Sequence, residues 1–142
     1  MIDGAADNRR RQADRLRQCG IAPTHQRIEI ACVLFEAGGH FTAEEVFSVL
    51  NQQQAGVSRA TVYNTLNLFA ERGLVKQLEL GRGCIQYDTN MAPHHHVVNY
   101  ADMTLVDIPA EAVRVLGLPE LPLGTTLEGI EVVVRVHRDT GR

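Results

Sequence analysis

Three consecutive histidines, His94, His95 and His96, open an apolar run that is predicted to be a β-strand. Successive side chains of a strand point to opposite faces, so His94 and His96 project to one side and His95 to the other. Carboxylates at Asp88 and Asp107 lie near them in the sequence. Imidazole and carboxylate ligands together suit a divalent transition metal, and the lack of thiolates argues against a closed structural zinc site. The alternatives are haem binding and a solvated histidine cluster without a ligand.

The length and composition bound the class of protein. A chain of 142 residues suffices for one ordinary domain or two small ones, and 44% hydrophobic with 22% charged residues is typical of soluble globular proteins. No apolar run approaches the ~20 residues that cross a bilayer, and the polar N-terminus lacks the apolar segment of a secretory signal. The cysteines Cys19, Cys32 and Cys84 include no C-x-x-C pair, which favours free thiols. We therefore expect a cytoplasmic protein with no membrane contact.

Charge is unevenly distributed along the chain. The formal net charge is −3, yet residues 1–88 carry ten Lys or Arg against ten Asp or Glu, whereas residues 89–142 carry four against seven. Near the N-terminus the basic side chains are Arg9, Arg10, Arg11, Arg15 and Arg17. A nucleic acid would therefore bind a local patch rather than the whole surface.

Four helices are predicted in the N-terminal half. The first spans Arg9 to Gln18 and stops at Gly20, and the second opens at Pro23-Thr24 and ends at Gly38-Gly39. Thr42-Ala43-Glu44-Glu45 has the pattern of a capping box, which predicts the start of the third helix.

The fourth helix is expected to run from Arg59 to Glu71, with Ser58 as its N-terminal cap. Val62, Leu66 and Phe69 recur at helical spacing and should face the core. A second row faces outward and carries side chains that can read bases or bind phosphates, namely Arg59, Tyr63, Asn64 and Asn67. The recognition helix of a helix-turn-helix needs such a row, although an ordinary amphipathic surface helix would have the same spacing.

A small β-hairpin is predicted directly after the fourth helix. Its strands are Leu74 to Leu80 and Cys84 to Asp88, and Gly81-Arg82-Gly83 forms the tip. Helices followed by a hairpin are the element order of a winged helix, which places Arg82 on the wing, where a phosphate would lie.

The strands after Pro93 are expected at residues 97–100 and 104–108, with a turn centred on Ala101-Asp102. This register places Asp107 directly across from His96, close enough to share an ion. A turn shifted by one residue would place Asp107 across from His95 instead.

The last part of the chain predicts a short helix, Ala110–Leu116, and a β-branched strand, Ile130–Val136. That strand would complete a three-stranded antiparallel sheet in a small α/β domain. Such a sheet with one short helix has a thin core, and a second copy of the chain would cover it. We therefore expect a homodimer.

Over nearly its whole length the chain resembles the ferric uptake regulator superfamily. The residues that carry the resemblance are Pro23-Thr24-His25-Gln26-Arg27, His40-Phe41-Thr42-Ala43-Glu44-Glu45-Val46-Phe47 and Val57-Ser58-Arg59-Ala60-Thr61-Val62-Tyr63-Asn64-Thr65-Leu66. Within the superfamily, the haem- and iron-sensing iron response regulators are the most similar subgroup, through Pro93-His94-His95-His96 and the ending Ile130–Val136.

The resemblance implies an α+β protein with a winged helix-turn-helix DNA-binding domain at residues 1–88, a hinge at 89–93 and a dimerisation and metal-sensing domain at 94–142. It also implies a regulatory site for Fe(II) or Mn(II), and it alone gives His40 a role. The implied ligands are His40, Asp88, His94, His96 and Asp107. An ion there would fix one arrangement of the domains, and so set the spacing of two recognition helices on an AT-rich inverted repeat of double-stranded DNA.

Three departures from the family pattern limit what is carried over. Where many members have the first of two C-x-x-C pairs for structural zinc, this chain has Asn99 and Asp102, and its end has no cysteine, so no structural zinc is expected. Many members have a basic residue, associated with minor-groove contact, just before the Pro23-Thr24 motif, and this chain has Ala22 at that position. The cysteine-proline haem motif is absent because Gly20 follows Cys19, so any haem sensing would depend on His94, His95 and His96.

The leading hypothesis is an iron- or haem-responsive DNA-binding regulator of the repressor type. A peroxide sensor that acts through iron-catalysed oxidation of His40 or His94 is an alternative. The carboxylates here are Asp, and the resemblance implies this reading because some peroxide sensors of the family have Asp where iron sensors have Glu. A small non-haem iron enzyme would share the His and carboxylate set, but the sequence has no phosphate loop or nucleophile elbow. A metal store would predict no salt-dependent affinity for DNA.

Overall fold

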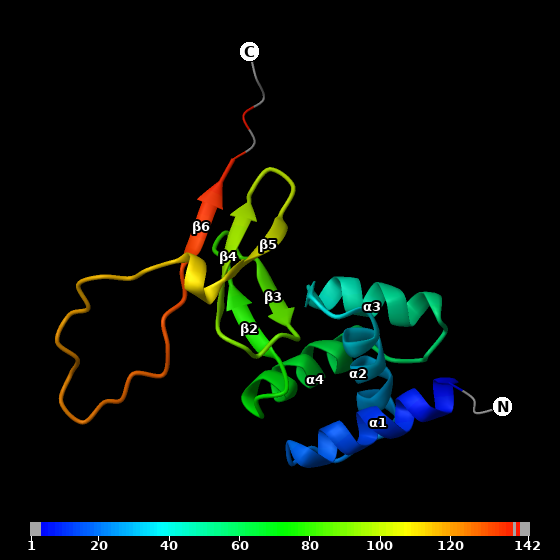
Figure 1. The fold of residues 1–142 in the computed structure, drawn as a ribbon. Coiled ribbons are helices and arrows are strands. Elements are labelled where there is room, and N and C mark those ends of the chain that lie inside the picture. Colours follow the sequence, from blue (N-terminus) through cyan, green and yellow to red (C-terminus); the bar gives the residue numbers. More distant parts are fainter. Residues whose placement is uncertain (1–3, 138, 140–142) are drawn as a thin grey trace. The chain divides into compact units, whose positions relative to one another are not determined.

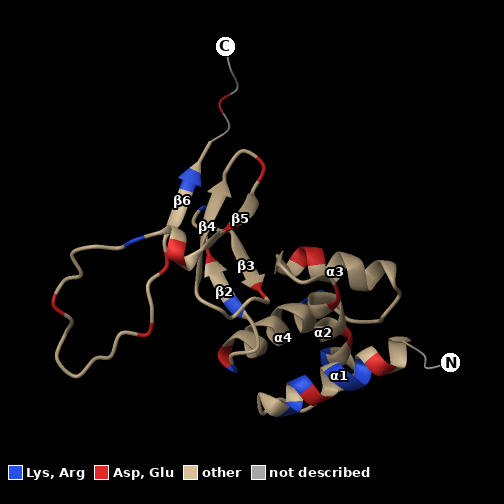
Figure 2. Cartoon of the chain, in the orientation of Figure 1, with Lys and Arg blue, Asp and Glu red and all other residues tan. Residues whose placement is uncertain are grey.

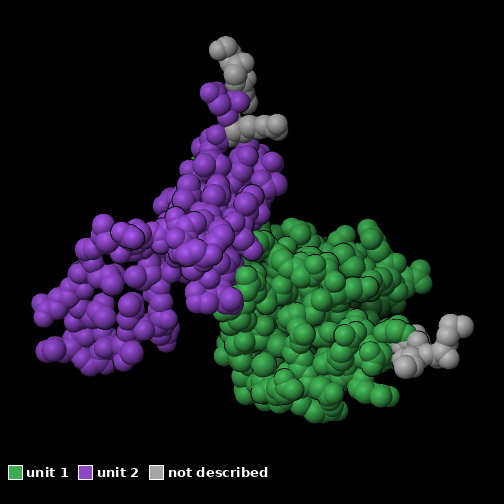
Figure 3. All heavy atoms as spheres, viewed as in Figure 1, with its two compact units in different colours: residues 1–91 green, residues 92–142 purple. Residues whose placement is uncertain are grey.

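The computed structural model describes residues 4–137 and residue 139. The chain divides between Met91 and Ala92 into two compact units (Figure 3). Each unit contains one three-stranded sheet of its own, and within the described residues all of the α-helices belong to the first (Figure 1).

Four helices make up most of the first unit: α1 (Gly4–Gln18), α2 (His25–Ala37), α3 (Ala43–Gln52) and α4 (Arg59–Glu71). Thr24, Thr42 and Ser58 cap α2, α3 and α4, because each hydroxyl accepts a hydrogen bond from the N–H three residues later. The predicted bounds of α4 and its cap are confirmed. Helix α1 begins at Gly4 rather than Arg9, since Ala5 and Ala6 also favour a helix.

The core of the first unit gathers around the inner face of α4. Val62, Leu66 and Phe69 have no exposed surface, as the helical spacing predicts. They belong to one apolar cluster with residues from the other three helices, including Leu16, Ile30, Leu34, Val46 and Leu50. Burial of each large apolar side chain contributes ~1.5–3 kcal/mol, so this packing holds α4 firmly and leaves its opposite face outward.

The sheet of the first unit has the strand order β1-β3-β2 and is antiparallel. Strands β2 (Lys76–Glu79) and β3 (Ile85–Asp88) form the predicted wing, and Arg82 at its tip has a φ of 55°. Strand β1 (His40–Phe41) is not predicted by the sequence, because two residues are too short to show a period of two. Its pairing with β3 sets His40 opposite Asp88.

The second unit is built on strand β4 (His94–Asn99), which lies between β5 (Thr104–Pro109) and β6 (Val133–Val136). Strands β4 and β5 form an antiparallel hairpin. Val98 is the one fully buried apolar side chain among the described residues of this unit, so its core is thin.

The second unit differs from the sequence predictions in two details. Strand β6 pairs parallel to β4 instead of antiparallel, which the long crossover of residues 113–132 allows. The helix expected at Ala110–Leu116 is a single 3-10 turn, η1 (Ala110–Ala112). The segment beyond it contains Gly117, Pro119, Pro122 and Gly124, residues that disfavour a helix, and it has no regular structure.

No helix of the described chain is long and apolar enough to cross a membrane. Cys19, Cys32 and Cys84 are free thiols, as predicted.

Candidate functional site

A first pair of candidate metal ligands, His40 and Asp88, lies in the first unit, where β1 meets β3. His40 Nε2 is 3.2 Å from Asp88 Oδ2. Asp88 has no exposed surface, and its Oδ1 accepts a hydrogen bond from Asn90 N–H at 2.9 Å. A buried carboxylate is costly unless positive charge and hydrogen bonds balance it, so the His40–Asp88 pair is well suited to a cation.

The backbone around the His40–Asp88 pair is shaped by two glycines and a threonine. Gly38 and Gly39 have φ values of 68° and 89°, in the left-handed region that other residues rarely adopt. This turn carries the chain from α2 directly into β1. Thr89 accepts a hydrogen bond at Oγ1 from Gly39 N–H and donates its own N–H to Gly39 O, so the strand ends are joined on both sides of the pair.

A second cluster, His94–His96–Asp107, lies on one face of the β4–β5 hairpin in the second unit. Asp107 Oδ1 is 3.8 Å from His94 Nε2 and 3.5 Å from His96 Nε2. The two imidazole rings meet edge to face, with centroids 4.5 Å apart. His96 pairs directly with Asp107, so the predicted register is confirmed and the register shifted by one residue is excluded.

Hydrogen bonds orient two of the three consecutive histidines in opposite ways. His94 Nδ1 is 2.6 Å from Ala92 O, and donation to that carbonyl leaves Nε2 as the lone-pair nitrogen that faces Asp107. His95 projects from the other face, and its Nδ1 accepts a hydrogen bond from Val132 N–H at 3.0 Å. His94 and His96 can therefore ligate together, whereas His95 helps to hold the segment before β6.

All the donor atoms in the His40–Asp88 pair and the His94–His96–Asp107 cluster are imidazole nitrogen or carboxylate oxygen. Such donors suit first-row divalent ions, and Mn(II) favours sets that are rich in oxygen. The residues therefore fit the Fe(II) or Mn(II) that the sequence resemblance implies.

The turn of the β4–β5 hairpin is held by side-chain caps. Asn99 Oδ1 accepts a hydrogen bond from Ala101 N–H, and Asp102 Oδ1 accepts from both the N–H and the hydroxyl of Thr104. These are the two positions where the resemblance would place the first zinc-binding cysteines. Here they close the turn without thiolates.

The outer face of α4 places the predicted DNA-reading row at the surface. Arg59, Tyr63, Asn64 and Asn67 are all exposed. Tyr87, on β3, donates its hydroxyl to Asn67 Oδ1 at 2.8 Å. This contact fixes the amide of Asn67 and leaves its NH₂ group oriented as a donor. Figure 2 shows further positive charge along α1.

A carboxylate from α3 holds two members of the row. Glu44 Oε1 is 2.8 Å from Arg59 Nε and 3.3 Å from the Tyr63 hydroxyl, which donates to it. The Arg59 guanidinium also lies 4.6 Å from the centre of the Phe47 ring. Glu44 is a functional candidate that the sequence did not reveal, because its only signal was a place in a capping box.

A shallow depression of about 300 Å³ lies between the start of α2 and the outer face of α4. It is lined by polar side chains that include Gln26, Arg27, Thr61 and Asn64. Arg27 was part of the Pro23–Arg27 motif but had no assigned role. The depression places it beside the helix that is predicted to read DNA.

Comparison with known proteins identifies the family. Residues 18–114 match the ferric uptake regulator family, and the chain belongs to it. It is 37% identical over 83 residues to the peroxide-responsive repressor PerR of Staphylococcus aureus strain Mu50, a stretch that is 58% of this chain and 56% of the relative. The chain thus spans about 56% of the length of this relative.

Solved structures of the same fold include the ferric uptake regulator from Pseudomonas aeruginosa with manganese. Its TM-score is 0.70 at 25% identity, and the match covers 89% of this chain and 97% of that one. The ferric uptake regulator from Francisella tularensis with iron has a TM-score of 0.66 at 20% identity, over 80% of this chain and 89% of that one. These likenesses confirm the predicted α+β class with its winged helix-turn-helix.

Proposed function

We propose that this protein is a metal-responsive transcription regulator that binds double-stranded DNA as a homodimer. The observation that carries the proposal is helix α4, whose inner face is fully buried and whose outer face presents Arg59, Tyr63 and Asn64. A firmly held helix with these side chains is what base reading in the major groove requires. Membership of the ferric uptake regulator family supports the same function.

The side chains of the first unit divide into base readers and phosphate binders. Arg59 can donate two hydrogen bonds to a guanine or to a phosphate, and Asn64 and Asn67 can pair with adenine. The Tyr63 ring can pack against a thymine methyl group. Arg82 on the wing and Arg27 beside α4 supply charge for the backbone, which positions the protein without reading the sequence.

We propose that one Fe(II) or Mn(II) ion is held jointly by the His40–Asp88 pair and the His94–His96–Asp107 cluster. The support is that each group offers too few ligands alone: two in the first unit and three in the second. An octahedral ion prefers more ligands than either group supplies alone. Bound there, the ion would supply the positive charge that the buried Asp88 carboxylate requires, and Asp107 would share it.

The regulatory step would be a shift between arrangements of the two units. Without a cation, Asp88 and Asp107 are like charges that oppose a shared site. A cation reverses that balance and favours one arrangement, and a favoured arrangement in each protomer sets the separation of two α4 helices along DNA. The ion can shift the equilibrium only by its difference in affinity for the two arrangements.

The homodimer is proposed to form through the second unit. Its described residues expose large apolar side chains, with Val106 61% and Leu116 80% exposed and Leu123 fully exposed. Such surface is more than a small monomeric unit usually leaves in water. A second copy would cover it.

Fluorescence anisotropy on an AT-rich inverted repeat tests the proposal. Metal-stripped protein, protein with Mn(II) and the His40→Ala variant with Mn(II) are compared. We expect Mn(II) to tighten binding and His40→Ala to remove that gain without changing the affinity of the stripped protein. Equal affinity in all three samples would refute the metal switch, and no salt-dependent affinity in any sample would refute DNA binding.

A peroxide sensor is a second candidate, favoured by the similarity to a peroxide-responsive repressor and by the two aspartates in the ligand set. In that case one hydrogen peroxide would transfer an oxygen atom to the imidazole of His40 or His94 and leave as water. Iron-loaded protein treated with peroxide should then gain one oxygen in a peptide containing either histidine and lose DNA affinity. Manganese-loaded protein is the control and should gain none.

Haem sensing and enzyme activity are less well supported. A haem would need an accessible axial imidazole, but His94, His95 and His96 are all at least 93% buried, and His95 is hydrogen-bonded to Val132. A spectroscopic titration with haem should therefore give no stoichiometric axial complex. Membership of a regulator family favours DNA binding over a non-haem iron enzyme.

A further inference from the structure

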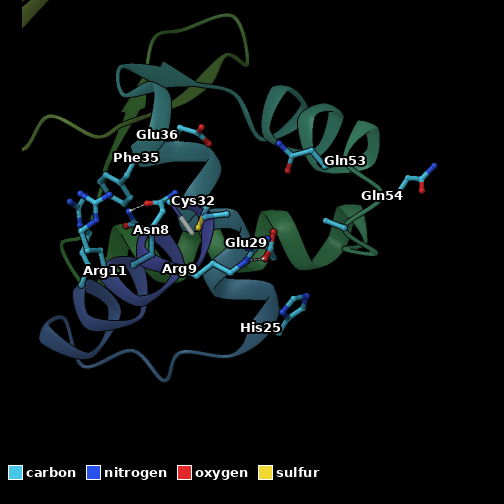
Figure 4. Close-up of a pocket in the computed structure, with 15 residues that line it drawn as sticks. Asn8, Arg9, Arg11, His25, Glu29, Cys32, Phe35, Glu36, Gln53 and Gln54 are labelled. Atoms are coloured by element: carbon cyan, nitrogen blue, oxygen red, sulfur yellow. Dashed lines mark hydrogen bonds and ion pairs between the residues drawn. The ribbon is translucent and has the colours of Figure 1, made fainter. Parts of the chain in front are cut away.

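A groove of about 890 Å³ runs between α1 and α2 in the first unit and ends at the turn between α3 and α4. It shares no residue with the His40–Asp88 pair or with the outer face of α4. Figure 4 shows Asn8, Arg9, Glu29 and Cys32 gathered between the two helices, with Gln53 and Gln54 at one end. The volume is that of a typical small-molecule site, roughly 300–1,000 Å³.

Gln12 lines this groove and is only 4% exposed. Its Nε2 donates to Asn8 Oδ1 at 2.9 Å, but within the described chain its Oε1 has no hydrogen-bond partner. Buried polar atoms in native proteins are nearly always paired, because an unsatisfied acceptor keeps the full cost of its lost hydration. The groove therefore offers a buried acceptor to a ligand that carries a hydroxyl or amine donor.

The groove also carries positive charge. Three arginines line it against two glutamates: Arg9, Arg11, Arg15, Glu29 and Glu36. Glu29 neutralises Arg9 through an ion pair of 2.8 Å. The Arg15 guanidinium carbon lies 3.9 Å from the centre of the Phe35 ring, a contact that orients the side chain without cancelling its charge. Arg11 Nε lies 3.7 Å from Asp7 Oδ2, but both side chains are exposed, so this ion pair is weak and leaves most of the charge available. Arg11 and Arg15 lie one helical turn apart, so both can face one anionic group.

We propose that this groove binds a small hydroxycarboxylate, with its carboxylate on Arg11 and Arg15 and its hydroxyl donating to Gln12 Oε1. Arginine forks match the geometry of carboxylates, and the buried amide oxygen requires a donor on the same molecule. Phe35 supplies an apolar wall for the carbon skeleton.

Malate and succinate are the matched probes, because they differ by the one hydroxyl that Gln12 would bind. Isothermal titration of the metal-stripped full chain avoids chelation and does not depend on DNA. We expect saturable binding of malate about tenfold tighter than that of succinate, the effect of one hydrogen bond to a buried group. No heat with either probe at millimolar concentrations would overturn the proposal.

Three variants separate the parts of the site. Arg15→Gln should weaken the binding of both probes. Gln12→Met should remove the preference for malate and leave the affinity for succinate unchanged. Arg10→Gln is the control, since Arg10 is exposed on the same helix and does not line the groove. Equal loss in Arg10→Gln and Arg15→Gln would show only non-specific attraction and would refute the site. Because Gln12 is buried, its variant is first checked for an unchanged helical circular dichroism spectrum.

Cys32 gives an independent readout because it lines the groove, whereas Cys19 and Cys84 do not. Burial raises the pKa of the Cys32 thiol, with a further rise from the Glu29 carboxylate, so its alkylation by iodoacetamide is slow and is best followed at alkaline pH. Malate should slow the alkylation of Cys32 and leave the other two cysteines unaffected. Equal rates with and without malate would place the ligand elsewhere.

Discussion

The two units of this protein achieve order by different means. Residues 1–91 bury an apolar cluster shared by four helices and the wing, whereas the described residues from 92 onward bury Val98 and three histidines. The first unit can hold the proposed recognition helix α4 firmly because the apolar cluster around it lies within that unit. The second exposes Val106, Leu116 and Leu123, which is the reason that we propose a partner chain and an ion for it. The proposed regulation would benefit from that division, because the part with the thinner core is the easier one for a ligand to shift.

Removal of a large core side chain from the first unit should have the largest effect. Phe69 is fully buried in the shared cluster, so Phe69→Ala should cost ~3–5 kcal/mol of unfolding free energy. Urea unfolding followed by circular dichroism measures it. Phe69→Leu keeps most of the apolar volume and should lose far less. Similar losses for both variants would mean that the packing is looser than the buried surface indicates.

Loss of a proposed ligand from the second unit should abolish the proposed response of the protein to metal. His96→Ala should weaken Mn(II) binding at least about a hundredfold, because it removes a proposed ligand and leaves Asp107 without that partner. His95→Ala is the matched control on the opposite strand face, where the imidazole bonds Val132. Titration with Mn(II) should separate the two variants. If they weaken binding equally, the two faces of β4 are not distinct in function.

Charges placed on the exposed leucines should break the proposed dimer. Leu116→Glu combined with Leu123→Glu should raise the dimer dissociation constant about tenfold or more, since each buried leucine contributes ~1.5–3 kcal/mol. Sedimentation at several concentrations measures the shift. Gln18→Glu, on the exposed end of α1, should leave the dimer unchanged. An unaffected double variant would place the interface elsewhere.

The smallest effect should come from the carboxylate that holds Arg59 and Tyr63. Glu44→Gln removes a negative charge from the proposed DNA-facing surface and loosens Arg59. Affinity for random DNA should therefore rise about two- to fivefold, while discrimination in favour of the inverted repeat, the proposed operator, falls. Glu45→Gln makes the same charge change one residue away, without those contacts. Anisotropy on operator and random duplexes gives both affinities. Identical behaviour of the two variants would reduce the role of Glu44 to net charge.

Local signals in the sequence predicted much of the first unit. The period of Val62, Leu66 and Phe69 and the cap at Ser58 predicted α4, and glycines around Arg82 predicted the wing. The turn at Ala101-Asp102 predicted that His96 pairs with Asp107. Each of these features depends on residues close together in the chain, where propensity and spacing are informative.

Contacts between distant residues could not be predicted in the same way. Strand β1 forms because His40 and Phe41 pair with β3, which lies nearly fifty residues later in the chain. Glu44 on α3 likewise forms an ion pair with Arg59 on α4. The parallel β6 depends on a crossover whose path leaves no periodic pattern. His40 was assigned as a ligand through the family resemblance alone, and that assignment remains a proposal.

The buried hydroxyl of Tyr87, which donates to Asn67, sets an alkaline limit for the first unit. Burial raises the pKa of Tyr87 above the ordinary 10.0 of tyrosine. The unfolded chain would release this proton near the ordinary pKa while the folded chain keeps it, so its stabilising contribution is complete below that pH and is lost as the pH rises through the higher folded pKa. The Tyr87→Phe variant should lose stability at neutral pH and be less sensitive to alkali, so the outer face of α4 is tied to a side chain that must stay protonated.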